Sequence, residues 1–505
     1  MNIPEAEIEQ PDNENFGDYS TNAALKLAKK EGKNPREVAE EIVKNLAQEK
    51  IFEKIEIAGV GFINFYLSKE FLRGQVSEIL KEGKNFGQLD LGKGKKISID
   101  FVSANPTGPV HIGNARGGPL GDVLGNVLVA AGFKVSRDYY LNDVGHQVEI
   151  LGHSIIGDEQ AQYRGQYIDE LRKKIKGSDL KKVGEQGVKI ILEETVKPAM
   201  AKLGINFDNW ISEKELQQNG QVDKVLNFLK EKDYIYEKDG AWWFKASAWG
   251  DEKDRVVIKS TGEKTYFGSD IASHKYRLEQ GADKLIDIWG ADHHGDVKRI
   301  KGALAALGYE NRLEIILTQF VRVIKDGQEM KMSKRAGTYV SIDDLIDEAG
   351  KDATRFFFLV RSPDTHMDFD LDLARQQSEK NPVYYVQYAS ARIHNILAKF
   401  KIKNSKFKIT NRNLKLLTQL AEMDLIKQLI RLPEVIEDTA GDYQVQRLPQ
   451  YALDLVRAFH KFYEECRVID EDKDLTRARL ELVEAARIVL KNTLDLMGIS
   501  APEKM

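Results

Sequence analysis

Apolar residues along the chain follow two spacings, and the spacing changes from region to region. Apolar positions that alternate with polar ones predict strands, and apolar positions three or four residues apart predict helices. Strands are predicted at residues 55–67, 97–101, 135–141 and 284–289, and helices at residues 22–30, 35–46, 120–131 and 475–490. The chain therefore mixes both element types at first and becomes mainly helical toward its end.

The order of elements between residues 97 and 141 is strand, turn, helix, strand. This order is typical of the first half of a doubly wound, Rossmann-type nucleotide fold, which binds ligands at the carboxyl ends of its strands. From about residue 150 to 259, charged helical segments and an aromatic hairpin-like stretch predict an insertion, and the second half of the fold resumes at residues 265–275.

A chain of 505 residues is too long for one ordinary domain. We predict an N-terminal α/β appendage at residues 1–85, a Rossmann-type catalytic domain at residues 95–375 with the insertion at about 150–259, and an all-α helix bundle at residues 376–505. A glycine- and lysine-rich stretch at residues 81–96 suits a linker. The predicted fold class is α/β, with these two further domains.

Composition limits the environment and the partners. Hydrophobic residues make up 42% of the chain, and no apolar run approaches the roughly 20 residues that a membrane span needs. The N-terminus is acidic and polar, unlike a signal peptide, so we expect a cytoplasmic protein without a membrane partner. Cys466 is the one cysteine, which excludes an intramolecular disulfide and a Cys-rich zinc site.

The net charge of −4 excludes a generally basic nucleic-acid coat, so any RNA contact must be local. The clearest basic stretch is residues 399–415, which contain no acid. The sequence leaves open whether this stretch is a solvated loop between helices or contacts phosphates.

The string ANPTGPVHIGN at residues 104–114 stands between a predicted strand and a predicted helix. Such a turn brings an imidazole, a glycine-freed backbone and the positive end of a helix to one place, which suits a nucleotide phosphate. His111 can donate to a phosphate oxygen, Gly113 allows close approach of the backbone, and Asn114 offers an amide donor. Alone, a His-x-Gly turn is more often a capping detail.

A second string, KMSKR at residues 331–335, lies about a domain's length downstream. The ammonium groups of Lys331 and Lys334 would neutralise the β- and γ-phosphates of ATP as pyrophosphate departs. Met332 and Ser333 of the string, and Gly290, complete the predicted ATP contacts. Mg²⁺ is expected to arrive with ATP, held mainly by phosphates and water. A KMSK string alone is commonly a solvated loop, but the two strings in this order argue against both bland interpretations.

Together the two strings resemble the signatures of a class I aminoacyl-tRNA synthetase, and the remaining chain resembles arginyl-tRNA synthetases. The resemblance implies a ligase that activates L-arginine with ATP and transfers it to tRNA(Arg), releasing AMP and pyrophosphate. Strings that carry the resemblance include FGDYSTNAALKLAK, AGVGFINFYLS, DFVSANPTGPVHIGN, YYLNDVGHQ, TYFGSDIASHKYR, IWGADHHGDVKR, NPVYYVQYASARI and GISAPEKM.

The resemblance also implies an arginine pocket. The tyrosine and aspartate that hold the substrate's guanidinium and amine match Tyr266 and Asp270, and further pocket positions match Asp100, Ser103 and Asn105. Physical reasoning agrees, because a guanidinium presents five donors in a fixed fork and needs carboxylate and carbonyl acceptors in matching geometry. Such acceptors reject wrong ligands strongly, so no editing domain is needed.

The densest polar cluster is Asp292, His293 and His294. These residue types can bind metals, but three consecutive residues cannot easily converge on one ion. The resemblance places amino-acid and ATP contacts here, and His293 is the preferred pocket residue. We expect no protein-bound structural metal.

For the RNA, the resemblance implies that the N-terminal domain contacts the tRNA elbow and that the C-terminal bundle reads the anticodon. Tyr463 and Arg467, four residues apart and predicted on one helix face, match anticodon positions, and Met505 is a third candidate. A half-buried bundle tyrosine is the alternative for Tyr463. Arginyl enzymes generally require tRNA before they activate arginine, so tRNA is implied as a partner in both steps.

Some positions depart from the family pattern. Asn114 stands where histidine is commoner, Arg335 stands where serine ends the signature in the wider class, and the N-terminal domain lacks its usual first helix, which suggests an incomplete or trimmed domain. Two other functions stay open: another class I synthetase such as a glutamyl-type enzyme, whose pocket would be lined with cations, and an inactive RNA-binding relative. We expect a monomer, because no heptad seam is evident.

Overall fold

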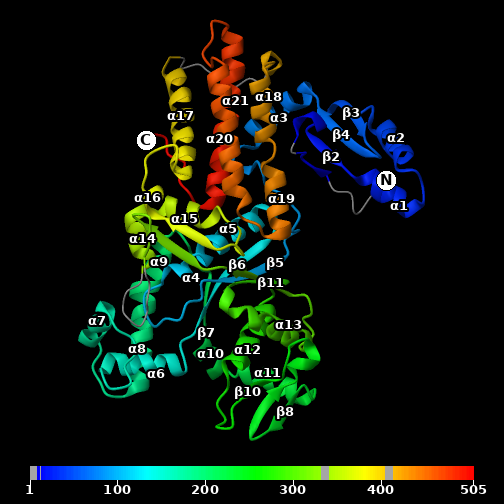
Figure 1. Cartoon of the computed structure of the whole chain (residues 1–505). Coiled ribbons are helices and arrows are strands. Elements are labelled where there is room, and N and C mark those ends of the chain that lie inside the picture. Colours follow the sequence, from blue (N-terminus) through cyan, green and yellow to red (C-terminus); the bar gives the residue numbers. More distant parts are fainter. Residues whose placement is uncertain (1–7, 12, 331–339, 404–412) are drawn as a thin grey trace.

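The computed structural model describes residues 8–11, 13–330, 340–403 and 413–505. Figure 1 shows the central sheet in the middle of the molecule, the C-terminal helices standing above it, and two groups of smaller elements below it. The N-terminal unit lies to one side of the helices. None of the described helices is long and apolar enough to cross a membrane.

The central sheet is parallel throughout and has the strand order β12-β11-β5-β6-β7. Its strands are β5 (Lys96–Phe101), β6 (Lys134–Leu141), β7 (Asn209–Ser212), β11 (Lys284–Gly290) and β12 (Leu313–Thr318). The strand order reverses between β5 and β11, which makes this the switch point where such sheets bind ligands. The predicted Rossmann-type fold class is confirmed.

Helices cover both faces of the sheet: α5 (Gly117–Ala130) lies above it and α12 (Tyr266–Glu279) below it (Figure 1). Glycine lets α5 approach closely, because a Cβ at Gly121 would lie 2.3 Å from the Phe101 ring. The helix stops where Gly132 takes φ +89°, and a Cβ there would lie 2.7 Å from the Leu89 carbonyl oxygen. The small, apolar sequence of α5 thus sets its distance from β5 and its end.

The C-terminal helices are α17 (Pro382–Lys403), α18 (Leu420–Leu429), α19 (Leu432–Asp442), α20 (Arg447–Glu465) and α21 (Lys473–Met497). The apolar face predicted at residues 475–490 belongs to α21, and Gly498 caps this helix with φ +65°. Buried residues of these helices and of the central sheet form one continuous hydrophobic core. The bundle is therefore packed onto the sheet domain through apolar contact.

Arg355, on α15 (Lys351–Leu359), fixes the junction between bundle and sheet domain. Its side chain is fully buried, and its guanidinium donates to the Asp122 carboxylate on α5 (2.6 Å) and to the carbonyl oxygens of Met497 (2.8 Å) and Leu203 (3.1 Å). A buried guanidinium with a carboxylate and two carbonyl acceptors holds three separate segments in one geometry.

The N-terminal unit is an antiparallel sheet of order β1-β2-β4-β3 with helices α1 (Ala23–Glu31) and α2 (Pro35–Leu46). Its strands are β1 (Ile8–Glu9), β2 (Tyr19–Thr21), β3 (Phe52–Ala58) and β4 (Phe62–Leu67). The single strand predicted at residues 55–67 is wrong: the chain reverses at Gly59 (φ +55°) and Gly61 (φ +143°) and forms a hairpin. Alternating apolar residues on both strands hid the turn.

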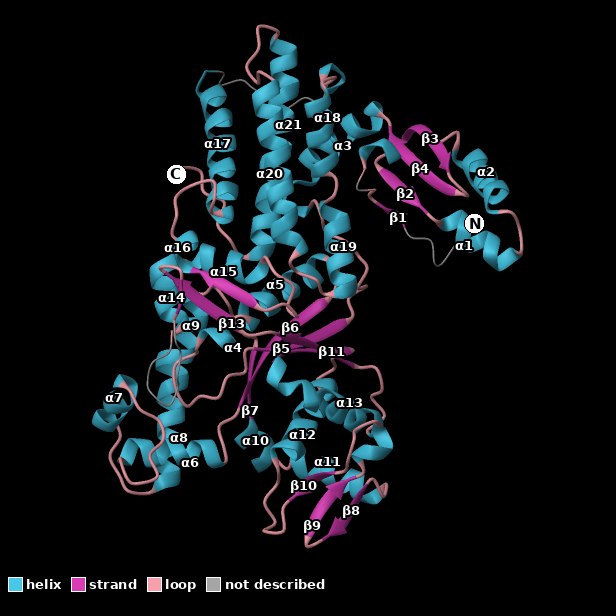
Figure 2. Cartoon of the chain, in the orientation of Figure 1, coloured by secondary structure: helices cyan, strands magenta, loops and turns pink. Residues whose placement is uncertain are grey.

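The N-terminal unit contacts the bundle through polar groups. The Tyr19 hydroxyl donates to Glu434, and Lys427 pairs with Asp18 at 2.6 Å. The following helix, α3 (Lys69–Glu82), packs against α18 and α21. The unit is thus attached to the side of the bundle, away from the central sheet (Figure 2).

Two groups of elements lie below the sheet (Figure 2). One group comprises α6 (His146–Ile156), α7 (Gln166–Lys174), α8 (Leu180–Ile191) and α9 (Lys197–Lys202). The other comprises α10 (Glu213–Gln218), α11 (Gln221–Glu231), α13 (Val297–Ala306) and a small antiparallel sheet of β8 (Ile235–Lys238), β9 (Ala241–Phe244) and β10 (Arg255–Ile258). The segment predicted as an insertion also supplies β7, so part of it belongs to the central sheet.

A third small sheet follows β12 and consists of β13 (Val321–Lys325), β14 (Gln328–Glu329) and β15 (Met367–Asp370). Between β14 and β15 the chain forms α14 (Ile342–Ala349) and α15, and α16 (Leu371–Ala374) follows β15. The side chain of Ser341 caps α14 together with Asp344 in a reciprocal capping box.

Replacement of Gly498 by alanine tests the Arg355 junction. Gly498 and Gly32 cap their helices at nearly the same angles (φ +65° and +67°), but a Cβ at Gly498 would lie 2.4 Å from the Arg355 guanidinium, whereas one at Gly32 meets open space. We expect Gly32→Ala to cost about 1–2 kcal/mol of unfolding free energy for left-handed strain. Gly498→Ala should cost on the order of 3 kcal/mol more, because it displaces a buried ion pair.

Urea unfolding of both variants, followed by circular dichroism, measures the difference. Equal losses of unfolding free energy in the two variants would show that the Arg355 side chain can move away from residue 498 without a cost in stability.

Candidate active site

An open cleft of about 450 Å³ lies at the carboxyl ends of β5 and β11, at the switch point of the sheet. All the described residues that the sequence predicted for ATP and arginine line this cleft. They are Asp100, Ser103, Asn105, His111, Gly113, Asn114, Tyr266, Asp270, Gly290 and His293. The structure thus brings together, from four segments of the chain, the described residues that the two predicted sites require.

The loop after β5 is strained where it enters the cleft. Val102 and Ser103 have backbone φ angles of +68° and +33°. Residues other than glycine rarely adopt such values, and they are least favourable for a β-branched residue such as valine. The turn lets the Ser103 hydroxyl donate to Asp100 (2.6 Å) and accept from the Tyr140 amide (2.9 Å). Asn142 donates to the side chain of Asn105 (3.0 Å). Residues of β6 and its following loop therefore hold this loop in place.

His111 precedes the short helix α4 (Ile112–Ala115), and the Gly113 amide donates to His111 Nδ1 at 3.1 Å. This bond makes Nδ1 an acceptor, so Nε2 carries the proton of the neutral ring and can donate. The short helix continues through Arg116 into α5. The buried guanidinium of Arg116 donates to the carbonyl oxygens of Thr365 (2.9 Å) and Ser362 (2.8 Å). The first motif is thus anchored to the loop before β15.

The second motif, including Lys331, Met332, Ser333 and Lys334, lies outside the described residues, but the chain after it does not. Residues 340–342 pair with residues 110–112: the Ile112 amide donates to the Val340 carbonyl oxygen (3.3 Å), and the Ile342 amide to that of Val110 (3.0 Å). The described chain after the second motif therefore begins beside His111.

Helix α12 supplies one wall of the cleft. Its residues at intervals of four, Tyr266, Asp270 and His274, lie on one face, and all three line the cleft. The side chain of Asp270 is 14% exposed and Tyr266 is 52% exposed, so a ligand can reach both. Thr265 caps the N-terminus of α12, because its hydroxyl accepts a hydrogen bond from the Gly268 amide. The helix therefore begins at Tyr266.

Three aspartates stand at the same level of three adjacent strands. In the register of the parallel sheet, Asp100 on β5 pairs with Asp287 on β11 and with Asp138 on β6. All three are buried, with exposures of 8%, 1% and 3%. Like charges this close in a low-dielectric interior need compensation by cations.

Helix α12 provides that compensation through His274 and Arg277. Arg277 donates to Asp287 (2.7 Å) and to the Ser98 hydroxyl (2.7 Å) and lies 3.4 Å from Asp138. His274 Nε2 lies 2.7 Å from Asp287, and its Nδ1 lies 2.8 Å from the Asp270 carbonyl oxygen and 3.3 Å from the Asp270 carboxylate. Together they form a continuous buried ion network that reaches the cleft at Asp100 and Asp270.

The network shifts two pKa values far from their usual range. Burial raises the pKa of Asp100 to about 6, against the opposing influence of Arg277. Burial alone would lower the pKa of His274, but the carboxylates of Asp287 and Asp270 raise it to about 10. His274 is therefore an imidazolium at neutral pH. If all four aspartates are ionised, the network carries two negative charges in excess.

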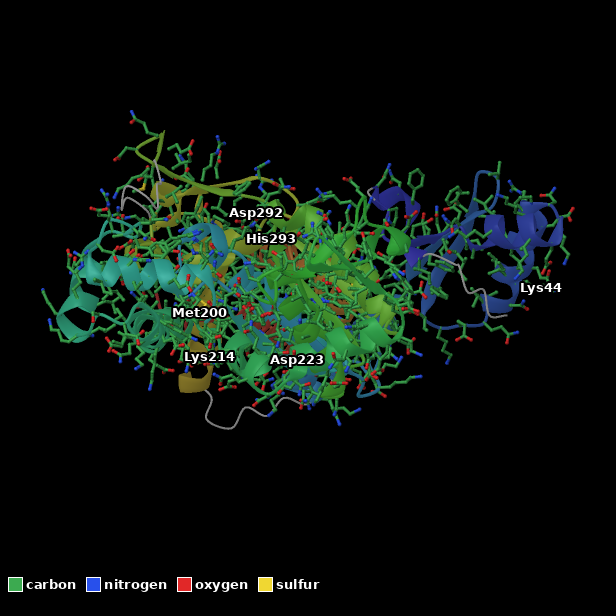
Figure 3. The ribbon with its side chains drawn as sticks, turned by 90° about the horizontal axis from the view of Figure 1, so that it is seen from below. Lys44, Met200, Lys214, Asp223, Asp292 and His293 are labelled. Atoms are coloured by element: carbon green, nitrogen blue, oxygen red, sulfur yellow. The ribbon has the colours of Figure 1, made fainter. Side chains whose placement is uncertain are left out.

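After β11 a turn of 3-10 helix (Ala291–Asp296) carries Asp292 and His293, which lie beside each other in Figure 3. His293 Nδ1 lies 3.2 Å from Asp296, and its ring packs against Trp289. A Cβ at Gly290 would lie 2.4 Å from the Asp292 carboxylate, so a larger residue at this position would displace the Asp292 side chain. In the described part of the chain, no three His, Cys, Asp or Glu residues gather in a way that could hold a metal ion.

The anticodon candidates lie far from the cleft. Tyr463, on α20, is 41% exposed, and the guanidinium of Arg392 on α17 lies 5.2 Å from the centre of its ring. Met505 is exposed and borders an open cavity with α17 residues. The prediction that Tyr463 and Arg467 share a helix face is wrong, because α20 ends at Glu465 and the Cys466 backbone is extended. Residues 404–412 of the basic stretch lie outside the described residues.

Three family profiles match the chain. The description "tRNA synthetases class I (R), catalytic domain" matches residues 75–179 and 181–359, "Arginyl tRNA synthetase N terminal domain" matches residues 1–67, and "DALR anticodon binding domain" matches residues 386–505. The chain belongs to the arginyl-tRNA synthetase family.

Individual arginyl-tRNA synthetases agree along almost the whole chain. An arginine–tRNA ligase of Carboxydothermus hydrogenoformans is 43% identical over 99% of this chain and 94% of its own length, and one of Bacillus subtilis is 44% identical over 100% and 95%. The Thermus thermophilus arginyl-tRNA synthetase structure has a TM-score of 0.79 at 22% identity, covering 99% of this chain and 96% of its own, which shows the shared fold. The predicted family and enzyme class are confirmed.

Sequence reasoning missed five residues that line or support this cleft: Tyr140, Asn142, His274, Arg277 and Asp287. A signal existed for three of them. His274 and Arg277 follow Asp270 at intervals of four and seven, one helical face, and Asp287 interrupts an apolar strand, where a buried acid requires a partner.

The raised pKa of His274 predicts a pH dependence of stability. A histidine with a folded pKa of about 10 and an unfolded value near ~6.5 contributes stability that is fully present below pH ~6.5 and lost as pH rises toward 10. We expect wild type to be more stable than His274→Gln at pH 7, with a gap in unfolding free energy that narrows by about 3 kcal/mol between pH 7 and pH 10.

The gap is measured by urea unfolding at several pH values. His394→Gln is the matched control, since His394 makes the same bond to the carbonyl oxygen four residues earlier (Ser390, 2.9 Å). A gap that stays constant with pH would mean that His274 is neutral in the folded protein.

Proposed function

We propose that this protein activates L-arginine with ATP at the switch-point cleft and transfers it to tRNA(Arg). In the first step the arginine carboxylate attacks the α-phosphorus of ATP, and pyrophosphate leaves. In the second step a hydroxyl of the terminal ribose of tRNA attacks the carbonyl carbon of arginyl-adenylate, and AMP leaves. The observation that carries the arginine assignment is the excess negative charge of the ion network where it meets the cleft.

In the proposed first step, ATP lies along the residues 111–114 side of the cleft. His111 Nε2 and the Asn114 amide donate to phosphate oxygens, while Gly113 and Gly290 allow close approach of the backbone. One donor of this kind contributes roughly 3–4 kcal/mol to transition-state stabilisation. Lys331 and Lys334, with Met332 and Ser333, would act on the departing pyrophosphate. Mg²⁺ enters with ATP as part of the substrate.

Arginine lies on the α12 side in this proposal. Asp270 accepts from its guanidinium and Tyr266 packs against it, and the ionised form of Asp100 adds a second acidic acceptor nearby. Ser103, Asn105 and His293 line the same cleft and are proposed to bind the α-amino and carboxylate ends. A glutamyl-type pocket would need cations at these positions, and the exposed charges of this wall are acidic.

The remaining assignments concern tRNA and the state of the protein. We propose that Tyr463 and Met505 contact the anticodon, with Arg467 acting from the loop after α20, and that the N-terminal unit contacts the tRNA elbow. The exposed Tyr463 with Arg392 beside it suits base stacking. Division into domains at residues 1–85, 95–375 and 376–505, a monomeric state and a cytoplasmic location belong to the same proposal.

ATP–pyrophosphate exchange with each of the twenty amino acids, with and without total tRNA, tests the function. We expect exchange with arginine only and only in the presence of tRNA. Exchange with another amino acid would leave the fold and the ATP site intact but reject the arginine pocket. A folded protein that binds tRNA but shows no exchange would be an inactive relative, with Asn114 as the first residue to examine.

Asp270→Asn tests the pocket separately. A charged hydrogen bond contributes about 1.5–3 kcal/mol, so we expect the KM for arginine to rise about 10- to 100-fold while the KM for ATP stays within twofold. Asp223→Asn is the control, because Asp223 forms a surface ion pair with Lys264 (2.7 Å) and is visible in Figure 3 away from His293. Equal effects of the two substitutions on the KM for arginine would remove Asp270 from the pocket.

A further inference from the structure

We propose that His274 is a positioning residue of the arginine site: it acts as a permanent cation that holds the Asp270 carboxylate in place and keeps the acidic cluster behind it charged. This inference rests on the proposed function, because it assigns a purpose to a group directly behind the proposed guanidinium acceptor. His274 is buried, while the Asp270 carboxylate reaches the cleft, so the histidine acts through the aspartate.

Arg277 and His274 hold the pKa of Asp287 below its usual value against the effect of burial, and with Asp287 ionised the hydrogen-bond geometry requires a doubly protonated ring. Nδ1 faces the Asp270 carbonyl oxygen, which can only accept a hydrogen bond, and Nε2 faces Asp287, whose other oxygen accepts from Arg277. A neutral imidazole has one donor nitrogen and one acceptor nitrogen, so it would leave one of these short contacts without a proton. The imidazolium satisfies both contacts.

The same ring nitrogen fixes the orientation of Asp270. Nδ1 lies 2.8 Å from the Asp270 carbonyl oxygen and 3.3 Å from its carboxylate Oδ1, so the cation holds one carboxylate oxygen against the helix. The edge of the Trp289 indole packs against the imidazole with ring centres 6.3 Å apart, which restricts ring rotation. Asp270 is therefore oriented before any ligand arrives, and such pre-organisation saves ordering cost on binding.

Charge balance gives His274 its second effect. The buried charged groups of this region are Arg277 on α12, Asp287 on β11, Asp100 on β5, Asp138 on β6 and Glu213 at the start of α10, and the half-buried Asp270 joins them from α12. Across the cleft stand Asp292, His293 and Asp296. Acids outnumber cations in this set, so without the imidazolium the cluster would hold a proton on one of its carboxylates at neutral pH. Asp100, whose pKa burial already raises to about 6, is the carboxylate that takes up this proton, and the less negative wall of the cleft would then bind a guanidinium poorly.

The test is the pH dependence of the KM for arginine in tRNA aminoacylation by the full chain. In wild type we expect the KM to rise as pH falls through about 6, where Asp100 takes up a proton. Loss of a neighbouring cation raises the pKa of a carboxylate by about 1–3 units, so in His274→Gln the rise should begin at least one pH unit higher. At pH 7 its KM for arginine should be about twofold above wild type for a shift of one unit and about tenfold for a shift of two units, and it should recover partly at pH 8.5.

Asp287→Asn supplies a test of opposite sign. Asp287 raises the pKa of Asp100, so its neutralisation should move the KM profile to lower pH. If these residues acted only on the structure, both substitutions could change the KM for arginine, but the pH profile would not shift in opposite directions according to the charge removed. If His274→Gln fails to fold, His274→Asn takes its place, and the same shift of the KM profile to higher pH is expected.

Two control measurements accompany this test. The KM for ATP should stay within twofold in both variants, and His394→Gln should match wild type in both KM values. An unchanged pH profile in both His274→Gln and Asp287→Asn, with wild type charging tRNA with arginine, would overturn the inference and leave the proposed function standing. A wild type that does not use arginine at all would overturn the proposed function itself.

Discussion

The arrangement around the cleft depends on one electrostatic constraint: three buried aspartates at the same level of β11, β5 and β6 must be neutralised. An uncompensated buried charge costs several kcal/mol, so the three strands are stable in this register only with α12 in place. Arg277 and His274 supply the compensating charges from a single helix face. The sheet and α12 are therefore one unit energetically, and the position of Tyr266 and Asp270 follows from it.

The loop that follows β5 depends on the same strands of the sheet. The left-handed backbone at Val102 and Ser103 is unfavourable by itself, and it persists because Ser103 bonds both to Asp100 and to the Tyr140 amide on the neighbouring strand. From that turn the chain proceeds to His111, where residues 340–342 pair with it. Strain at the edge of the cleft is thus balanced by hydrogen bonds to rigid strands, which suits a site that must hold reacting groups in fixed positions.

Periodicity in the sequence predicted the strands β5, β6 and β11, the helices α5 and α21, and the place of the cleft, because these features depend on local spacing and on the strand order of one known fold class. It failed at Gly59 and Gly61, where a turn lies inside an alternating pattern, and at Arg467, where the helix stops two residues earlier than the spacing assumes. The alignment of the three buried aspartates could not be predicted from the sequence, for a different reason. Strand register places Asp100, Asp138 and Asp287 side by side, and register between distant segments is not a local property.

Helix α5 connects the cleft to the bundle. At its beginning it continues from His111 through the buried Arg116, in its middle Asp122 binds Arg355, and Arg355 also holds the last carbonyl of α21. Close-packed glycine contacts with Phe101 prevent the helix from moving independently of β5. A displacement of α21 at its C-terminal end would therefore break a buried ion pair or shift α5 against the sheet, and both cost several kcal/mol. The anticodon-binding domain and the HIGN motif are for this reason mechanically continuous through a single helix.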